Sequence, residues 1–426
     1  MPEIILSINA GSSSVKISVY KSPNHATPDS TPIQLAEASI EGLTAPPATL
    51  KYSRGDKSIK GEEIQDIKSQ EDAFRYILDH LTKDDGLPEL ARHEDIHFAC
   101  HRVVHGGDYP HSQVIDKETF HHIEELSDLA PLHNAPALSI VEASSKILPG
   151  AINVAYFDSA FHATIPDYIH TYPIDQTVAK KNKLRKYGFH GISYDFITHA
   201  VGTYLSKPTS DVNIIALHLG SGASACCIKA GKSLDTSMGL TPLAGLPGAT
   251  RSGSIDPSLM FHFTHSAGKP SRSSSEKMHI TEAEEILNKK SGWKSLTGTT
   301  DFGQISGSER AEDVLAFKIF VDRIVNYVAP YFTKLNGEVD ALVFAGGIGE
   351  RGAKLRTAVV DGVKCLGFAL DGEKNEGSGD EVVTDISKKD ARYKTLIIKT
   401  DEQLQMAKGV LIDRERLERE KGAGSG

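Results

Sequence analysis

The chain has 426 residues, of which 39% are hydrophobic and 24% charged, and its formal net charge is −9. A chain of this length exceeds what one ordinary hydrophobic core supports, so we expect two domains. No apolar run approaches the roughly 18 to 20 residues of a membrane span, and the acidic balance argues against a nucleic-acid surface. The chain starts with a strand pattern and no secretory signal, so we expect a cytoplasmic protein.

Residues 3–20 are interpreted as two strands joined by a polar turn. Apolar side chains dominate residues 4–8, and they alternate with polar ones over residues 15–19, as in a half-buried antiparallel pair. The turn between them holds an asparagine, one glycine and three serines, and Lys16 follows it. Such a turn can bring backbone N–H groups, hydroxyls and an ammonium group to phosphate oxygens.

A second copy of this plan begins at Ile214. Aligning Ile5 with Ile214 superimposes the two strand patterns, and the same alignment places Gly11 on Gly220 in the turn. The sequence therefore predicts an internal duplication, although identity between the copies is low and two hairpins can resemble each other by chance. Residues 220–225 also fit the dinucleotide pattern G-x-G-x-x-G/A, but the residues that follow predict a strand rather than the required helix, which argues against a Rossmann site.

Between the two hairpins, residues 21–60 are rich in Pro, Ser and Thr, and we expect loops with irregular edge strands there. Residues 70–83 have apolar side chains at helical spacing and predict an amphipathic helix. A strand near residues 96–99 leads to Arg102 and His105 before a Gly-Gly turn. Polar side chains at the end of such a strand often point into a ligand crevice, although a surface arginine is the alternative.

Three polar sites follow in the first half. Prolines at 131 and 136 bracket a predicted short loop that carries His133 and Asn134 ahead of a helix N-terminus, a place that favours anions. For His133 by itself, an ordinary loop histidine is the alternative. Residues 152–157 predict a buried strand that ends at Asp158. Phe189 and His190 lie in a predicted glycine-bounded turn before another helix.

In the second half, residues 236–257 form a long Gly- and Pro-rich segment with a single arginine, Arg251, and such segments tend to be functional. Thr281 and Glu284 have capping-box spacing and predict a helix start, and residues 310–335 predict a long helix. Residues 340–344 predict a strand that opens into AGGIGER, where glycines allow a nucleotide close to the backbone. Residues 396–417 predict a strand, a turn and a helix that returns to the first domain.

Taken together, these motifs resemble the acetate kinase family in chain order over nearly the whole length. The matching segments are LSINAGSSSVK, RVVHGG, PLHNAP, FDSAFH, YGFHG, HLGSGAS, TSMGLTPLAG, TRSGSIDP, FAGGIGER and TDEQ. The resemblance implies the α/β fold of sugar kinases, the heat-shock ATPase and actin, with two duplicated ribonuclease H-like domains and a nucleotide cleft between them. It implies an acyl kinase domain I, residues 1–158 plus 401–426, and a nucleotide-binding domain II, residues 159–400.

The activity that the resemblance implies is reversible, Mg²⁺-dependent transfer of the ATP γ-phosphoryl group to acetate, giving acetyl phosphate and ADP. A homodimer is usual in the family. Alternatives within the same fold are a propionate or butyrate kinase and a pyrophosphate-dependent acetate kinase. A chaperone-like ATPase module is the alternative from another class, and it would need a partner-binding domain for which the chain has no spare length.

The resemblance also implies roles for individual residues. Asn9 and Glu402 would hold Mg²⁺ or its waters. The catalytic residues would be Arg102, His133, Asp158, His190 and Arg251. The acetate methyl group would lie in a pocket made by Val104, Leu132, Phe189 and Pro242. The nucleotide and its phosphates would contact Ser12, Ser14, Lys16, His218, Leu219, Gly220, Ser221, Gly222, Asp301, Phe302, Gly303, Gly346, Gly347, Ile348, Gly349, Glu350 and Arg351.

The chain departs from the family pattern on the nucleotide side. Ser221 and Arg351 stand where the family usually has Asn, Gly303 where it has Arg, Ser254 where it has Asp, and residues 247–249 read Pro-Gly-Ala instead of Met-Met-Gly. The identity of the phosphoryl donor is therefore the least fixed point. Pyrophosphate-using relatives block the adenosine cleft near Gly347 and Ile348, and the retention of these two residues favours ATP.

Asp158 occupies the position that the family assigns to a catalytic acid. A carboxylic acid substrate has a pKa of about 4 and is already ionised at neutral pH, so it leaves no proton to abstract. We therefore predict that Asp158 orients Mg²⁺ waters or holds an arginine, and that it does not act as a base.

Overall fold

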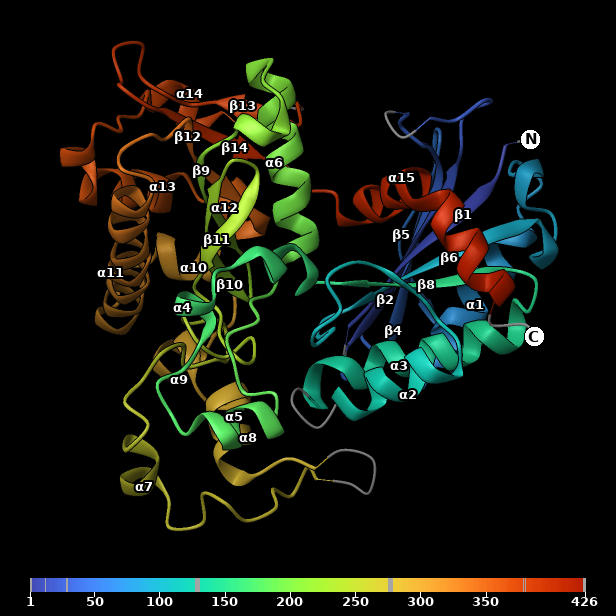
Figure 1. Cartoon of the computed structure of the whole chain (residues 1–426), viewed down its shortest axis with the longest axis horizontal. Coiled ribbons are helices and arrows are strands. Elements are labelled where there is room, and N and C mark those ends of the chain that lie inside the picture. The colour runs from blue at the N-terminus through green and yellow to red at the C-terminus, as the bar shows by residue number, and fades with distance from the viewer. Residues whose placement is uncertain are drawn as a thin grey trace. The chain divides into compact units, whose positions relative to one another are not determined.

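The computed structural model describes residues 2–11, 13–27, 30–126, 131–274, 279–377, 379 and 381–423. The chain divides into two compact units, and each contains one mixed sheet (Figure 1). Unit 1 comprises Met1–Ala160 and Asp401–Gly426, and unit 2 comprises Phe161–Thr400.

The sheet of unit 1 has the strand order β5-β4-β3-β2-β1-β6-β8-β7. Its strands are β1 (Ile4–Ala10), β2 (Ser14–Lys21), β3 (Ile33–Glu41), β4 (Ala48–Arg54), β5 (Lys57–Ile64), β6 (Ile96–Val103), β7 (Gln113–Val114) and β8 (Ile152–Phe157). Neighbours from β5 to β1 pair antiparallel, whereas β6 pairs parallel to both β1 and β8. The carboxyl ends of β1, β6 and β8 therefore meet at one edge.

The prediction of loops with irregular edge strands over residues 21–60 is confirmed in part. Strands β3 and β4 lie toward the β5 edge of the sheet, and the pairing register shifts between Val19 and Tyr20 opposite β3 and between Leu50 and Lys51 of β4. The strands are nevertheless continuous, and Ala36, Ala38 and Ile40 alternate into the core together with Leu50 and Tyr52. Small alanines at buried positions give a weak alternation of hydrophobicity, which explains why the period of two was missed.

Helices cover both faces of this sheet. On one face lie α1 (Gln70–Thr82) and α3 (Pro131–Ile147), with α2 (Lys117–Leu126) against α3, and on the other lies α15 (Glu402–Ala423) (Figure 1). One-turn 3₁₀ helices occupy Pro88–Leu90 and His93–Asp95. The predicted helix over residues 70–83 is confirmed by α1, whose N-cap Ser69 accepts from the Asp72 N–H at 3.1 Å.

The predicted loop between the prolines at 131 and 136 was also wrong. Helix α3 begins at Pro131, so Asn134 lies inside it, and Pro136 is an interior residue. A proline is favourable at the first helical position because its missing N–H has no partner there in any helix. Pro136 loses one intrahelical hydrogen bond, a penalty that the packing of the buried Ile140 and Ala143 in the core offsets.

Unit 2 repeats the central topology of unit 1. Its strands are β9 (Ile214–Leu219), β10 (Ala223–Lys229), β11 (Lys232–Thr236), β12 (Ala341–Ala345), β13 (Val383–Asp385) and β14 (Lys394–Ile398), in the order β11-β10-β9-β12-β14-β13. In both units an antiparallel hairpin, β1–β2 or β9–β10, is followed by two strands parallel to its first strand. The predicted second hairpin is confirmed, and the shared strand order supports the duplication.

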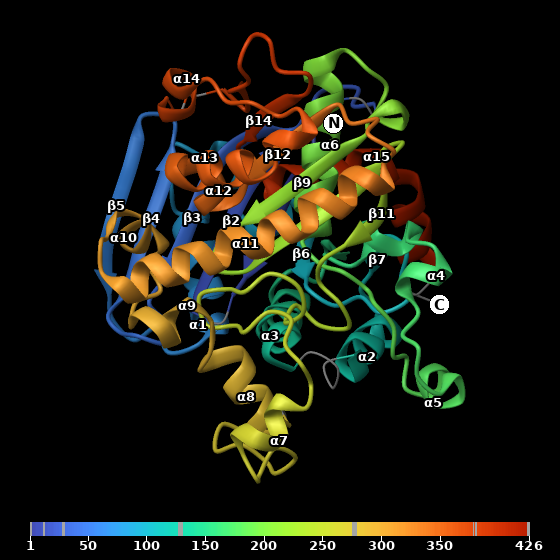
Figure 2. The same cartoon turned by 90° about the vertical axis from the view of Figure 1, so that its left-hand side faces the viewer.

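Two long helices flank this sheet, α6 (Gly191–Leu205) on one face and α11 (Ala311–Lys334) on the other, and Figure 2 shows the length of α11 against its strands. The other helices of unit 2 are short. They are α4 (Asp167–His170), α5 (Gln176–Lys181), α7 (Leu259–Phe263), α8 (Glu282–Lys289), α9 (Gly292–Thr297), α10 (Phe302–Gly307), α12 (Gly346–Arg351), α13 (Ala353–Gly362) and α14 (Gly372–Glu376), with 3₁₀ turns at Ala160–Thr164, Thr209–Asp211 and Lys364–Leu366.

Several local predictions for this half are confirmed. Thr281 and Glu284 form the capping box of α8, and α11 occupies the long helical stretch. Strand β10 directly follows the glycines at 220 and 222, so the exclusion of a Rossmann helix holds. Among the described helices, none combines the length and the apolar character needed to cross a bilayer.

Candidate active site

The first cluster lies in unit 1, where three neighbouring parallel strands end. Asn9 is near the end of β1, Arg102 near the end of β6, and Asp158 directly follows β8. Arg102 donates from Nε and Nη2 to the two carboxylate oxygens of Asp158, at 3.0 and 2.6 Å, and from Nη1 to Asn9 Oδ1 at 3.3 Å. This bidentate pair fixes the plane of the guanidinium group.

Glu402, the first residue of α15, completes what we call the Arg102 cluster (Asn9, Arg102, Asp158 and Glu402). Its Oε2 lies 3.7 Å from Arg102 Nε. Burial works against the positive charge of Arg102, but Asp158 and Glu402 outweigh it and raise the pKa of Arg102, which stays a cation. Burial also raises the pKa of Glu402, although Arg102 acts in the opposite direction. A buried carboxylate, Asp158, and a partly buried one, Glu402, thus face one guanidinium group.

The composition of the Arg102 cluster fits Mg²⁺. This ion prefers oxygen ligands and is commonly held by one or two carboxylates together with substrate phosphates. Asn9 and Glu402 supply an amide and a carboxylate oxygen, and the surplus negative charge of the cluster favours a cation. The described residues contain no group of three or more His, Cys, Asp or Glu that would form an all-protein metal site. The residues present therefore fit an ion that is shared with substrate phosphates.

The turn after β6 is clamped by a side chain from α3. The Asn134 amide accepts from the His105 N–H at 2.9 Å and donates to the His105 carbonyl at 3.0 Å. A Cβ at Gly106 would lie 2.3 Å from the Phe157 ring, so only glycine fits there. The clamp holds Val104, whose side chain is half-buried in this turn. Ser12 and the side chains of Leu132 and His133 lie outside the described residues.

Lys16 and Ser14 lie on β2, across the hairpin from Asn9. Lys16 is the direct cross-strand partner of Asn9, and its ammonium group pairs with Glu37 at 2.9 Å. The positive charge of Lys16 also lowers the pKa of Glu402, against the larger effect of burial. Lys16 therefore adds positive charge near the Arg102 cluster.

The second cluster lies in unit 2 around His190. This residue has φ 61°, in the left-handed region, and directly precedes α6. Its ring stacks on that of His218 with centroids 4.2 Å apart. A Cβ placed at Gly222 would lie 3.0 Å from Arg251 Nη1 and 3.6 Å from His190 Nε2. The bare backbone at Gly222 is thus faced by an arginine and a histidine nitrogen.

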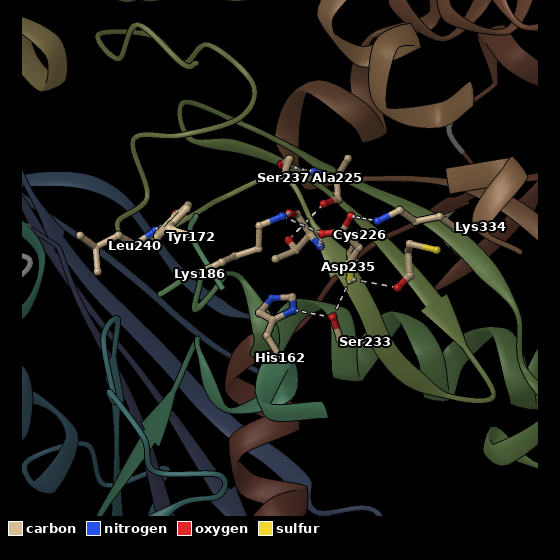
Figure 3. Close-up of polar contacts among 12 residues, drawn as sticks. His162, Tyr172, Lys186, Ala225, Cys226, Ser233, Asp235, Ser237, Leu240 and Lys334 are labelled. Carbon is tan, nitrogen blue, oxygen red and sulfur yellow. Dashed lines mark hydrogen bonds and ion pairs between the residues drawn. The ribbon is translucent and has the colours of Figure 1, made fainter. Parts of the chain in front are cut away.

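His162 stabilises the left-handed turn before α6. A carbonyl can only accept, so His162 Nε2 donates to the Phe189 carbonyl oxygen, at 3.0 Å. Figure 3 shows the contact of His162 with Ser233, in which Nδ1 lies 2.7 Å from Ser233 Oγ. A Cβ at Gly188 would lie 2.4 Å from a methyl carbon of Thr236, so the turn requires glycine there. Phe189 is buried under His190.

Two lysines from different elements contact Asp235, Lys186 from the segment before α6 and Lys334 from the end of α11. Figure 3 shows Lys186 and Lys334 on opposite sides of Asp235, in β11. Lys186 Nζ lies 2.8 Å from Asp235 Oδ1 and donates to the Thr236 carbonyl at 3.1 Å, and Lys334 Nζ contacts the other carboxylate oxygen. Sequence reasoning missed this cluster because its members are far apart in the chain and belong to no motif.

A cavity of about 490 Å³ opens next to the turn of the second hairpin. This volume is within the usual range for small-ligand pockets. The cavity is lined by Gly220, Ser221, Thr300, Asp301, Phe302, Gly303, Ser306, Gly347, Ile348, Arg351, Gly352 and Leu355. Eight of these are residues that the sequence analysis assigned to the nucleotide, and Thr300, Ser306, Gly352 and Leu355 were missed.

Four other predicted nucleotide residues of unit 2 are not among those that line this cavity, namely Leu219, Gly346, Gly349 and Glu350. Leu219 is buried in the core, and Gly346 packs so closely that a Cβ would lie 2.7 Å from the Leu219 carbonyl oxygen. Glu350 lines a neighbouring hollow. Arg356, almost fully buried, donates to the Gly349 and Glu350 carbonyls, each at 2.8 Å, and so fixes the end of α12. Burial lowers the pKa of Arg356 to about 10.

The two mixed sheets of repeated topology, together with the solved kinase structures that share this fold, define a kinase of the two-domain, actin-like ATPase class. Within that class, the chain belongs to the acetokinase family, whose model matches residues 4–408.

Relatives with assigned names match the sequence of this chain over almost its full length. The chain is 56% identical over 410 residues to a probable acetate kinase of Emericella nidulans, covering 95% of this chain and 96% of that one. It is 38% identical to the acetate kinase of Fructilactobacillus sanfranciscensis, with 95% and 98% covered.

Two solved structures share the fold and about a third of the sequence. The acetate kinase of Porphyromonas gingivalis has a TM-score of 0.79 at 32% identity, with 95% of this chain and 98% of that one covered. A propionate kinase of Francisella tularensis has a TM-score of 0.82 at 34% identity, with 96% and 98% covered.

Proposed function

We propose that this protein is an acetate kinase, which transfers the γ-phosphoryl group of ATP to the carboxylate of acetate and gives acetyl phosphate and ADP, reversibly. The observation that carries the proposal is the turn of residues 220–222. Gly220 and Ser221 line the nucleotide-sized cavity, and Gly222 is faced by Arg251 Nη1 and His190 Nε2. A terminal phosphate at this turn would meet nitrogen donors from two side chains.

The chemistry needs positioning and charge neutralisation more than covalent catalysis. In this proposal Arg251 and His190 donate to the oxygens of the transferring phosphoryl group. Arg102 binds the carboxylate substrate with N–H groups that Asp158 does not occupy. Asp158 holds that arginine in plane, since both of its oxygens accept from Arg102. No step requires Asp158 to take or give a proton.

Mg²⁺, when bound, neutralises negative charge on the ATP phosphates, and Asn9 and Glu402 are the residues that would hold it. Residues 1–158 with 401–426 would serve as the acyl domain, and residues 159–400 as the nucleotide domain. Acetate would place its methyl group against Val104, Leu132, Phe189 and Pro242. Of these, Phe189 and Pro242 are buried and Val104 is half-buried.

ATP rather than pyrophosphate is the proposed donor. Gly347 and Ile348 line an open cavity. A Cβ at Gly347 would lie 2.9 Å from Arg351 Nη2, so the guanidinium group occupies the space beside the glycine. Arg351 lies along the same wall, where its Nε donates to the Gly347 carbonyl at 3.2 Å. The cavity therefore has space for a nucleoside beyond the phosphates.

Propionate phosphorylation is the second candidate, because one solved relative of the same fold is named a propionate kinase. Initial rates with acetate, propionate and butyrate, each with ATP and with pyrophosphate, separate the candidates. We expect the highest kcat/KM with acetate and ATP. A higher value with propionate would make the chain a propionate kinase, and equal rates with pyrophosphate would overturn the choice of donor. Arg102→Ala is the control for contaminating kinases.

We further propose a cytoplasmic homodimer. Helix α7 exposes Phe261 and Phe263, by 72% and 65%, and paired exposed aromatics favour an interaction surface. Light scattering of the purified chain should give twice the monomer mass. A monomer in the wild type would refute this part of the proposal and leave the catalytic part untouched.

A further inference from the structure

A chain of hydrogen bonds runs from the interior of unit 2 to His190. Tyr194 Oη, from α6, lies 2.5 Å from Ser224 Oγ, from β10, and Ser224 Oγ lies 2.8 Å from His190 Nδ1. Tyr194 and Ser224 are both fully buried. Their protons must therefore go to protein acceptors and not to bulk water.

The direction of these bonds follows from counting protons. Burial raises the pKa of Tyr194 well above its ordinary value, so its hydroxyl keeps its proton. That oxygen already accepts from the backbone N–H of His218. Among the described residues, Ser224 Oγ is the acceptor within reach of the Tyr194 proton. Ser224 has one proton of its own, which is then left for His190 Nδ1.

His190 Nδ1 is therefore an acceptor, and the ring proton of the neutral histidine resides on Nε2. That nitrogen is the one that faces Gly222, 3.6 Å from where a Cβ would be. The ring cannot easily turn away, because it stacks on His218 and its backbone is fixed in the left-handed region. The edge of His162 also packs on Tyr194, with centroids 5.8 Å apart, and steadies the start of the chain.

We propose that Tyr194 and Ser224 are positioning residues that hold His190 in the tautomer with its proton on Nε2. A phosphoryl oxygen can only accept, so this tautomer presents a donor to it, whereas the other would present a lone pair. The inference rests on the proposed function, in which His190 Nε2 contacts the transferring phosphoryl group. It adds that His190 acts as a neutral donor whose proton position is set from the protein interior.

His218 has a matching arrangement. Ser193 Oγ, also fully buried, lies 2.7 Å from His218 Nδ1. A hydroxyl from α6 or β10 thus approaches the Nδ1 atom of each stacked histidine.

Long-range ¹H–¹⁵N correlation spectra of histidine-labelled protein test the proposal, because they distinguish protonated from unprotonated ring nitrogens without any turnover. His190→Gln assigns the signals. In the wild type at neutral pH we expect an unprotonated Nδ1 and a protonated Nε2 on His190. Tyr194→Phe frees Ser224 to accept and should move the population toward the Nδ1–H form. The matched control is Tyr204→Phe, which removes an exposed hydroxyl from the same helix and should leave the spectrum unchanged.

Kinetics give a second readout. Tyr194→Phe and Ser224→Ala should each lower kcat by about fivefold to tenfold, the ratio that corresponds to one ordinary hydrogen bond, with KM for ATP unchanged. A wild-type spectrum with the proton on Nδ1 would overturn the proposal, whether or not Ser224→Ala folds. So would a Tyr194→Phe spectrum identical to that of the wild type. Absence of acetate phosphorylation by the wild type would instead refute the proposed function.

Discussion

The role of Asp158 can be tested by the substitution Asp158→Asn, which keeps the shape of the side chain and removes its charge. Both carboxylate oxygens now accept from Arg102, at 3.0 and 2.6 Å, and the side chain is fully buried. Asparagine keeps one acceptor and turns an N–H donor toward the guanidinium group. Arg102 thereby loses its bidentate partner.

Removing one partner of a buried ion pair costs about 3–5 kcal/mol. Glu402 remains 3.7 Å from Arg102 Nε and compensates in part, so we expect the lower end, about 3 kcal/mol. If this loss falls on the transition state, kcat drops by about two orders of magnitude. Asp79→Asn, which removes an exposed surface carboxylate of the same unit, serves as control and should change neither stability nor kcat.

The assay is the pH dependence of kcat in the wild type and in Asp158→Asn, together with a Mg²⁺ titration and urea unfolding. We expect Asp158→Asn to have a lower kcat and a changed Mg²⁺ dependence. The pH profile of kcat in the wild type should contain no ionisation that is lost in the variant. A wild-type ionisation that is lost in Asp158→Asn, with Mg²⁺ affinity intact, would refute it and assign general acid–base catalysis to Asp158.

Three further predictions concern other sites. The folded state raises the pKa of Glu402, so it binds more protons than the unfolded state between the ordinary and the raised pKa, and stability falls as pH rises through that window. Glu402→Gln should therefore unfold at a urea concentration equal to or higher than that of the wild type at neutral pH, while it loses Mg²⁺-dependent activity. A variant that is less stable than the wild type would contradict this. Asp235→Asn leaves Lys186 and Lys334 without their carboxylate and should lower the free energy of unfolding by about 3 kcal/mol, as measured by urea unfolding. A decrease below about 1 kcal/mol, the level of an exposed ion pair, would show that these ion pairs contribute little to stability. Val104→Ala should raise the butyrate-to-acetate ratio of kcat/KM modestly, since one or two methylenes in an apolar pocket are worth about 1–3 kcal/mol, and an unchanged ratio would remove Val104 from the pocket.

Local patterns allowed much of the fold to be predicted. The helix over residues 70–83 and the second strand of the first hairpin each carry a clear period in their own residues, whereas the first strand and the strand before Asp158 are short, mostly apolar runs. The bounds of strand β3 were not predicted because Ala36 and Ala38 give little hydrophobic contrast. The start of α3 was missed because two prolines indicate a loop unless the core packing behind them is known.

The site was predictable where polar residues follow strands and not where they are joined across the fold. Asp158 was expected to hold an arginine or Mg²⁺ waters, and it contacts Arg102, although the consequence for catalysis stays a prediction. His162 and Ser224 lie within the quoted motifs and Tyr194 follows one of them closely, yet nothing in those motifs indicates that the three side chains meet near His190. Such contacts depend on tertiary structure and leave no periodic signal in the sequence.

The most direct test of the central claim is ³¹P NMR of the purified chain with ATP, acetate and Mg²⁺. The account predicts that acetyl phosphate and ADP appear together in equal amounts, and that added ADP and acetyl phosphate regenerate ATP. Formation of ADP with free phosphate and no acetyl phosphate would contradict it, because the chain would then be an ATPase that does not transfer the phosphoryl group to a carboxylate.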